Sequence, residues 1–151
     1  LSKLQTMPDM LPDRLESGTH NMPGIAGLLE GICYVQRTGV ETIAAHERRL
    51  TAQAVALLRQ TEGIRLFWRD GLRHQTGVLS FVVEGVDCEE LGEALARQGI
   101  ALRAGLHCAP LAHRTVGTLK TGTVRFSPSA FNTSQQVVQF AQILQRTIRK
   151  M

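Results

Sequence analysis

The segment that decides the fold is "GTVRFSPSAFNTSQQVVQFAQILQRTI", residues 122–148. Its first six residues place β-branched and aromatic side chains around one arginine, which predicts a strand. Thr133 stands three residues before Gln136, the spacing of a capping box, and predicts the start of a helix. The apolar residues of that helix recur at helical spacing and predict one buried stripe: Val137, Phe140, Ala141, Leu144 and Ile148.

Upstream of this segment, the apolar pattern predicts helices over residues 24–39 and 40–61, then strands over residues 63–71 and 76–86. A third helix is expected from Asp87, three residues before Glu90, to Gly99, followed by a short strand over residues 100–104. The order helix, helix, strand, strand, helix, strand, strand, helix predicts an α+β domain. We expect a small, mainly antiparallel sheet with helices packed on one face.

The composition narrows the function classes. The chain has 151 residues, a formal net charge of +4, and few aromatic residues that do not alternate with basic ones, so nucleic-acid binding gains little support. No apolar run approaches the roughly 18 residues of a membrane span. The three cysteines, Cys33, Cys88 and Cys108, are far apart, which argues against a disulfide framework and favours a reducing, cytoplasmic compartment.

A second segment, "LRAGLHCAPLAHRTVGT" at residues 102–118, concentrates polar chemistry. His107, Cys108 and His113 are types of metal ligand, but two of them are adjacent and no second ligand cluster follows, so no metal site is expected. Gly105 and the lack of a helical pattern favour an exposed loop between two strands.

A cysteine in such a loop could be a nucleophile. Arg103 and Arg114 nearby would favour the thiolate, which is the reactive form. The alternative is that Cys108 is a small buried apolar residue. That interpretation suits Cys33, within an apolar helix face, and Cys88, near a helix start; for Cys108 the residues alone leave both interpretations open.

Two further positions could bind anions. Arg125 stands in the strand beside Val124 and Phe126, and if it faces inward it needs an anion such as a carboxylate. The stretch "ESGTHN" places Gly18 and Thr19 in a turn whose backbone N–H groups and hydroxyl could bind a phosphate.

Three segments in this order, "DRLESGTHNMPGIAGL", "RAGLHCA" and "GTVRFSPSAFNT", resemble the C-terminal part of class V aminotransferase-like enzymes, which are pyridoxal-phosphate (PLP) proteins of fold type I. The resemblance covers residues 13–148 and is strongest to the cysteine desulfurase group that includes selenocysteine lyases. It implies that residues 24–151 form a C-terminal small domain, whose first helices border a large domain. Residues 1–23, with three prolines, would then be a leader or linker.

The resemblance also implies roles for the site residues. Cys108 matches the cysteine that attacks the substrate sulfur and becomes a persulfide, and Arg125 matches the arginine that binds the substrate carboxylate. Arg103 opens the loop motif, and His107 lies beside the cysteine in the substrate-binding region. Thr19, with Gly18, matches the segment that reaches the PLP phosphate of the neighbouring subunit in the family's homodimer.

Two departures from the family pattern shape the expectation. None of the three lysines, Lys3, Lys120 and Lys150, stands where the family binds PLP covalently, so we expect this chain alone to be a fragment without covalent PLP or turnover. Leu106 stands where the best-known desulfurases have a second histidine.

The sequence therefore predicts part of an enzyme that transfers sulfur from L-cysteine to Cys108 and releases alanine, with a sulfur acceptor protein as a further partner. Two alternatives stay open. One is a class V aminotransferase or lyase on another amino acid, with Cys108 not catalytic. The other is a binding or dimerisation module without chemistry of its own.

Overall fold

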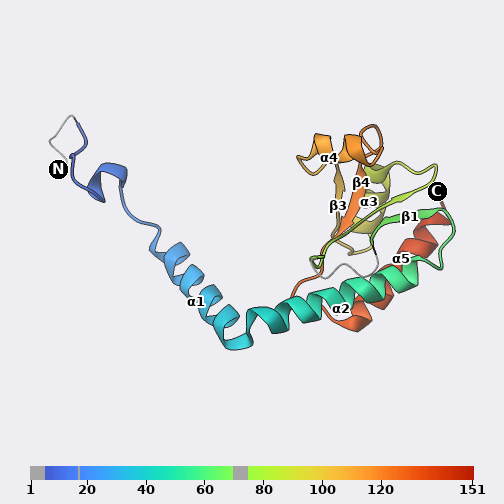
Figure 1. Cartoon of the computed structure of the whole chain (residues 1–151), viewed down its shortest axis with the longest axis horizontal. Coiled ribbons are helices and arrows are strands. Elements are labelled where there is room, and N and C mark those ends of the chain that lie inside the picture. Colours follow the sequence, from blue (N-terminus) through green and yellow to red (C-terminus); the bar gives the residue numbers. More distant parts are fainter. Residues whose placement is uncertain (1–5, 17, 70–74) are drawn as a thin grey trace. The chain divides into compact units, whose positions relative to one another are not determined.

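The computed structural model describes residues 6–16, 18–69 and 75–151 (Figure 1). Backbone contacts divide the chain into two compact units, residues 1–38 and 39–151, and each unit is described by itself. The first unit contains the 3-10 helix η1 (Asp13–Leu15) and helix α1 (Met22–Thr38). No described residue of α1 is buried, and six large apolar side chains of this helix are exposed: Met22, Ile25, Leu28, Leu29, Ile32 and Val35.

The second unit contains a four-stranded sheet and the remaining helices. In chain order the elements are α2 (Val40–Leu58), β1 (Ile64–Phe67), β2 (Leu79–Val83), α3 (Cys88–Ala96), β3 (Arg103–Gly105), α4 (Pro110–Thr115), β4 (Thr123–Phe126) and α5 (Ser134–Ile148). Within the described residues, the strands pair antiparallel in the order β1-β2-β4-β3. The predicted α+β class with a small antiparallel sheet is therefore confirmed.

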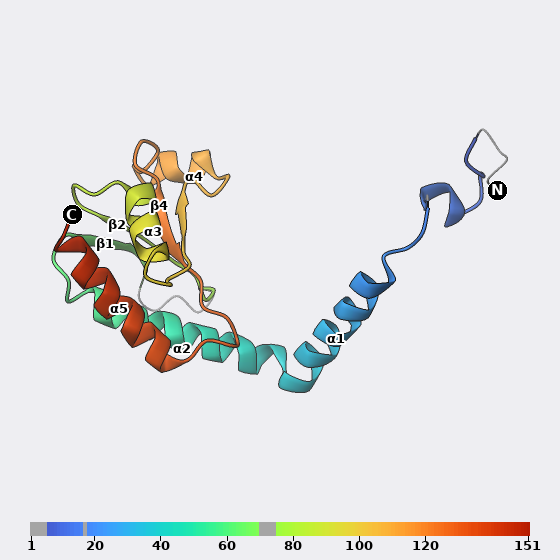
Figure 2. The same ribbon diagram turned by 180° about the vertical axis from the view of Figure 1, so that it is seen from behind.

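Helix α4 corrects the prediction that the segment around Cys108 has no helix. The helix is only six residues long, too short to show an apolar period. Pro110 occupies its first turn, where the fixed φ of proline suits a helix and the missing N–H is not needed. Figures 1 and 2 show α4 at the end of the sheet that lies far from α2 and α5.

The core lies between one face of the sheet and helices α2, α3 and α5. Alternate residues of β2, Leu79, Phe81 and Val83, are buried, as expected for a strand with one face in the core. Phe140 of α5 stacks on Phe126 of β4 with ring centroids 4.8 Å apart. Helices α2 and α5 run side by side along this layer (Figure 2).

The predicted caps determine where the helices begin. The Thr133 hydroxyl accepts a hydrogen bond from the backbone N–H of Gln136, and the Gln136 side chain accepts one from the backbone N–H of Thr133, so the capping box is confirmed. At the start of α3, the Asp87 carboxylate accepts hydrogen bonds from the backbone N–H groups of Glu89 and Glu90. In the described part of the chain, no helix is both long and apolar enough to cross a membrane.

A pair of matched leucine variants tests this core. Leu144 of α5 is fully buried, whereas Leu111 of α4 is 71% exposed. We expect Leu144→Ala to lower the free energy of unfolding by about 2–5 kcal/mol, because a buried cavity replaces packed methyl groups. Leu111→Ala should change it by less than about 0.5 kcal/mol. Urea denaturation followed by circular dichroism measures both values; equal losses would contradict the core described here.

Candidate active site

The two arginines expected at the site lie on the sheet face that points away from the core. Val124 and Phe126 of β4 are buried in the core, so the alternation of the strand turns Thr123 and Arg125 to the opposite face. Arg103 of β3 lies directly opposite Arg125 in the register of the two strands. Two like charges in this position repel each other. The pair is therefore suited to bind an anion between or beside the two guanidinium groups.

Arg125 has an unused donor. Its Nε atom is buried and has no hydrogen-bond partner among the described residues. A buried donor without a partner is costly, and a planar carboxylate satisfies a guanidinium group well. Arg125 can therefore bind a carboxylate on this face of the sheet.

Cys108 lies in a strained part of the loop after β3. His107 has a φ of 51° and Cys108 a φ of 58°, both in the left-handed region, which costs non-glycine residues roughly 1–3 kcal/mol each. The Cys108 side chain is exposed, and Nη2 of Arg103 lies 4.0 Å from its Sγ atom. The interpretation of Cys108 as a buried apolar residue is wrong. Arg114, the other predicted neighbour, is exposed on α4.

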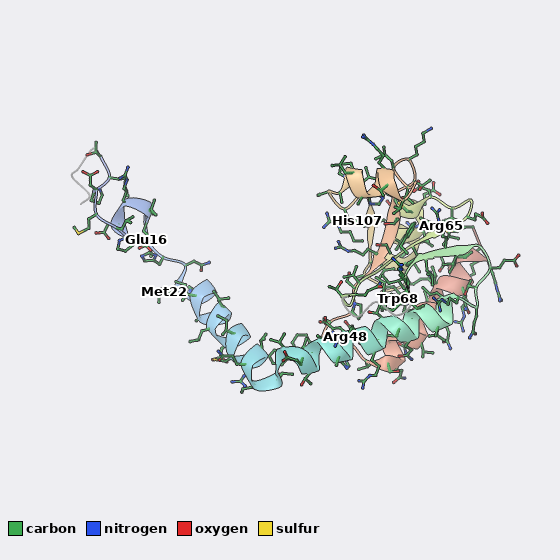
Figure 3. All side chains as sticks on the ribbon, viewed as in Figure 1. Glu16, Met22, Arg48, Arg65, Trp68 and His107 are labelled. Atoms are coloured by element: carbon green, nitrogen blue, oxygen red, sulfur yellow. The ribbon has the colours of Figure 1, made fainter. Side chains whose placement is uncertain are left out.

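His107, labelled in Figure 3, contacts β4 through the hydroxyl of Thr123. Its Nε2 lies 3.1 Å from the Thr123 hydroxyl, and its ring packs against that of His113 with centroids 5.8 Å apart. Its Nδ1 is buried and has no hydrogen-bond partner in the part of the chain that the structure describes. Burial lowers the pKa of His107, and the positive charges of Arg125 and His113 lower it further. The surroundings of His107 therefore favour its neutral form.

The other two cysteines differ from Cys108. Cys88, the first residue of α3, is only 6% exposed, and burial raises the pKa of its thiol. Cys33 lies on α1 and is half-buried, so its expected place in a buried apolar face is not observed. Among the described residues, no group of three His, Cys, Asp or Glu side chains could hold a metal ion.

The described residues do not provide for covalent PLP beside Cys108. Lys120 lines a hollow with Asp87 and Cys88, and Lys150 lines another with residues at the end of α5. Lys3 lies outside the described residues. The described surroundings of Cys108 thus include the Arg103 guanidinium, whereas the two described lysines line other hollows.

Gly18 and Thr19 belong to the first unit, so their place relative to Cys108 is not described. Both are exposed, and Gly18 has a φ of +85°, a conformation that glycine adopts without strain. The turn is open, since a Cβ atom at Gly18 would have no neighbour within 4 Å. It is accessible to an anion.

Thr123 and Thr118 are part of the site but were not predicted from the sequence. Thr123 stands two residues before Arg125, and the strand period places both on one face of β4. The sequence pattern was therefore sufficient to predict Thr123 beside Arg125. Thr118 accompanies His113, whose Nδ1 lies 2.8 Å from the Thr118 hydroxyl in a fully buried contact. The contact between His113 and Thr118 could not be predicted from sequence spacing, because helix α4 brings His113 to Thr118.

The state of His107 can be measured by NMR titration of its ring. We expect a pKa below the ordinary value of 6.5, and Arg125→Gln should raise it, because one of the neighbouring positive charges is removed. Arg114→Gln, the control, should leave it unchanged. Because the fold favours neutral His107, its contribution to stability is complete above pH 6.5 and is lost as the pH falls from there toward the folded pKa. A pKa at or above 6.5 would contradict this description.

Comparisons with known proteins agree with the geometry. The aminotransferase class-V family matches residues 3–140. The chain is 42% identical over 142 residues to a cysteine desulfurase of Synechococcus elongatus, covering 94% of this chain and 22% of that protein. It is 41% identical over 135 residues to a probable cysteine desulfurase of Mycolicibacterium paratuberculosis, covering 89% of this chain and 19% of the relative. The chain thus spans about a fifth of the length of these relatives.

Solved structures share the fold. The apo structure of a cysteine desulfurase from Thermococcus onnurineus superposes with a TM-score of 0.82 at 29% identity, covering 97% of this chain and 38% of that chain. A cysteine desulfurase from Escherichia coli superposes with a TM-score of 0.80 at 29% identity, covering 93% of this chain and 34% of that chain. By sequence and by fold, this chain belongs to the aminotransferase class-V family.

Proposed function

We propose that this chain is the thiol-bearing part of a PLP-dependent cysteine desulfurase. The whole enzyme takes sulfur from L-cysteine, leaves a persulfide on Cys108 and releases alanine. One observation carries the proposal: the exposed sulfur of Cys108 lies 4.0 Å from the Arg103 guanidinium. It sits on the sheet face where Arg125 keeps an unpaired buried donor. A nucleophile and a carboxylate-binding group are thereby joined in one site.

The proposed reaction balances without an added oxidant. The Cys108 thiolate attacks the sulfur of L-cysteine, an S–S bond forms, and the Cβ–S bond of the substrate breaks. The electron pair of that bond stays on the substrate carbon, which takes a proton and leaves as alanine. PLP, when bound in the whole enzyme, supplies the electron sink for the substrate.

The chain's own residues orient the substrate. Arg125 binds its α-carboxylate with charge-assisted hydrogen bonds, and Arg103 lies beside the reacting sulfur of Cys108. His107, neutral and with Nδ1 unpaired among the described residues, contacts the substrate from the side of β4. In this proposal Gly18 and Thr19 bind the PLP phosphate of a second subunit, so the whole enzyme is a homodimer.

The proposal also covers the place of this chain in the whole enzyme. Residues 24–151 are the C-terminal small domain, residues 1–23 lead into it, and the lysine that binds PLP is supplied by a large domain. The enzyme works in the cytoplasm and passes the persulfide sulfur to an acceptor protein. The exposed thiol of Cys108 supports that transfer, because an acceptor can reach it.

Two other candidates have some support. The matching family is named for aminotransferases, and in an aminotransferase or lyase acting on another amino acid Cys108 would have no role in the reaction. A binding or dimerisation module without chemistry is supported by the lack of a described lysine beside Cys108. The next experiment separates all three functions.

A chimera tests the proposed reaction. This chain replaces the matching segment of the Synechococcus elongatus relative, and alanine and persulfide are measured from L-cysteine with PLP present. We expect activity, and Cys108→Ser should reduce it by roughly a hundredfold or more, because the attacking atom is lost. Cys33→Ser is the matched control and should retain activity. This chain alone, with PLP, should release no alanine.

Each other function has its own outcome in this experiment. An aminotransferase or lyase would tolerate Cys108→Ser, and a module without chemistry would leave the chimera inactive while still folded. Turnover by this chain alone would contradict the expectation that PLP is bound elsewhere in the whole enzyme.

The carboxylate role of Arg125 is tested in the same chimera. Arg125→Gln should raise KM for L-cysteine by roughly 10- to 100-fold, the range that corresponds to losing a hydrogen bond to a charged group. Arg114→Gln removes the same charge from an exposed position of α4 and should change KM by less than about twofold. If both variants raised KM equally, Arg125 would act only through its charge, and its proposed role in binding the substrate carboxylate would be contradicted.

A further inference from the structure

The conformation of the Cys108 loop needs an explanation, because its two central residues are strained. His107 and Cys108 are consecutive non-glycine residues with φ values of 51° and 58°. Such residues persist in the left-handed region only when their surroundings hold them there. Cys108 is exposed, so its own side chain cannot be held by burial. The restraint must therefore act on His107 and on the chain around it.

The N–H of Ala109 donates to the carbonyl of Leu106 at 2.9 Å and closes the turn around these two residues. Two side-chain hydrogen bonds and one ring contact add to that restraint. His107 is tied to β4 through Nε2, which lies 3.1 Å from the Thr123 hydroxyl. On its other side, the ring packs against His113 at a centroid distance of 5.8 Å. His113 is itself fixed, because its Nδ1 lies 2.8 Å from the hydroxyl of Thr118. Both partners of this last bond are buried, at 6% and 0% exposure.

Thr118 is also tied into the backbone on both sides. Its N–H donates to the carbonyl of His113 at 2.8 Å, and its carbonyl accepts from the N–H of Gly122 at 2.8 Å. Thr118 thus connects the end of α4 to the start of β4, next to Thr123. The ring of His113 is therefore held by the connection between α4 and β4, outside the turn that contains His107 and Cys108.

From this arrangement we propose that His113 and Thr118 are positioning residues that hold His107, and through it Cys108, in the left-handed conformation that places the thiol beside Arg103. We call the buried pair the His113–Thr118 lock. The inference rests on the proposed function of Cys108, whose attack requires a fixed sulfur position. It assigns His113 a role beyond filling space in the fold.

The polarity of the pair favours this role over simple packing. An apolar residue at position 113 would fill the same space without a buried polar group to satisfy. A buried imidazole bonded to a buried hydroxyl instead fixes the ring orientation, because only one rotation of the ring keeps the 2.8 Å contact. That fixed ring is the surface against which His107 packs.

The three thiols of the chain provide the test. Iodoacetamide labelling of the 151-residue chain, followed by peptide mass spectrometry, gives separate rates for exposed Cys108, half-buried Cys33 and buried Cys88. We expect His113→Leu and Thr118→Val each to slow labelling of Cys108 about fivefold, because the released sulfur leaves the Arg103 guanidinium. The double variant should be no slower than either single one, since both break the same bond.

The controls separate positioning from folding. Thr118→Ser keeps the hydroxyl that bonds Nδ1 of His113 and leaves the His113 ring in place, so it should keep the rate within about twofold of the original. Thr115→Val removes a hydroxyl that bonds only within α4 and should have no effect. Cys33 is the reference rate, and continued protection of Cys88 shows that the core is intact.

Three results would overturn the inference. One is a labelling rate of Cys108 that is unchanged or faster in both His113→Leu and Thr118→Val while Cys88 stays protected. The second is Thr118→Ser being labelled at Cys108 as slowly as Thr118→Val. The third is Cys88 becoming reactive in parallel with the change at Cys108, which would assign the pair to stability alone. None of these depends on sulfur transfer, so the proposed function and the lock can fail separately.

Discussion

The stacking of Phe126 on Phe140 fixes how β4 sits against the helices, and the rest of the site depends on that register. With ring centroids 4.8 Å apart, the pair buries Phe126 and, two residues earlier, Val124. Because side chains alternate along a strand, Thr123 and Arg125 then point to the opposite face of the sheet. A slip of one residue would bury Arg125 and expose Phe126, so the site and the core depend on one hydrophobic contact.

This arrangement carries costs that the fold offsets elsewhere. Arg103 and Arg125 stand opposite each other, and His107 and Cys108 have left-handed backbones. Both unfavourable features lie on the sheet face that does not contribute to the core. The stability of the fold comes from the other face, which packs against α2, α3 and α5. Strain and charge are thus confined to the region where a ligand would relieve them.

Much of the fold and part of the candidate site could be predicted from the sequence. The stripe of α5, its capping box and the strand period around Arg125 predicted the strand–helix unit that carries the core, because each depends on residues near one another in the chain. Helix α4 was missed because six residues show no period, and Thr118 because its partner His113 is brought to it by that helix. The pattern of α1 predicted the helix but could not predict that its apolar face is exposed, since burial depends on what packs against it.

Two thiols at the end of β3 show how the fold separates an inert from a reactive sulfur. The Cys88 sulfur lies against Gly105 and Gly122, so closely that a Cβ at Gly122 would come within 2.8 Å of it. Only glycine fits there. Cys108 follows three residues after Gly105, on the open face beside Arg103. Burial raises the pKa of Cys88 and keeps it protonated, whereas Cys108 is reachable from solvent and from a partner. In the proposed reaction, the core therefore offers no accessible thiolate to compete for a persulfide on Cys108.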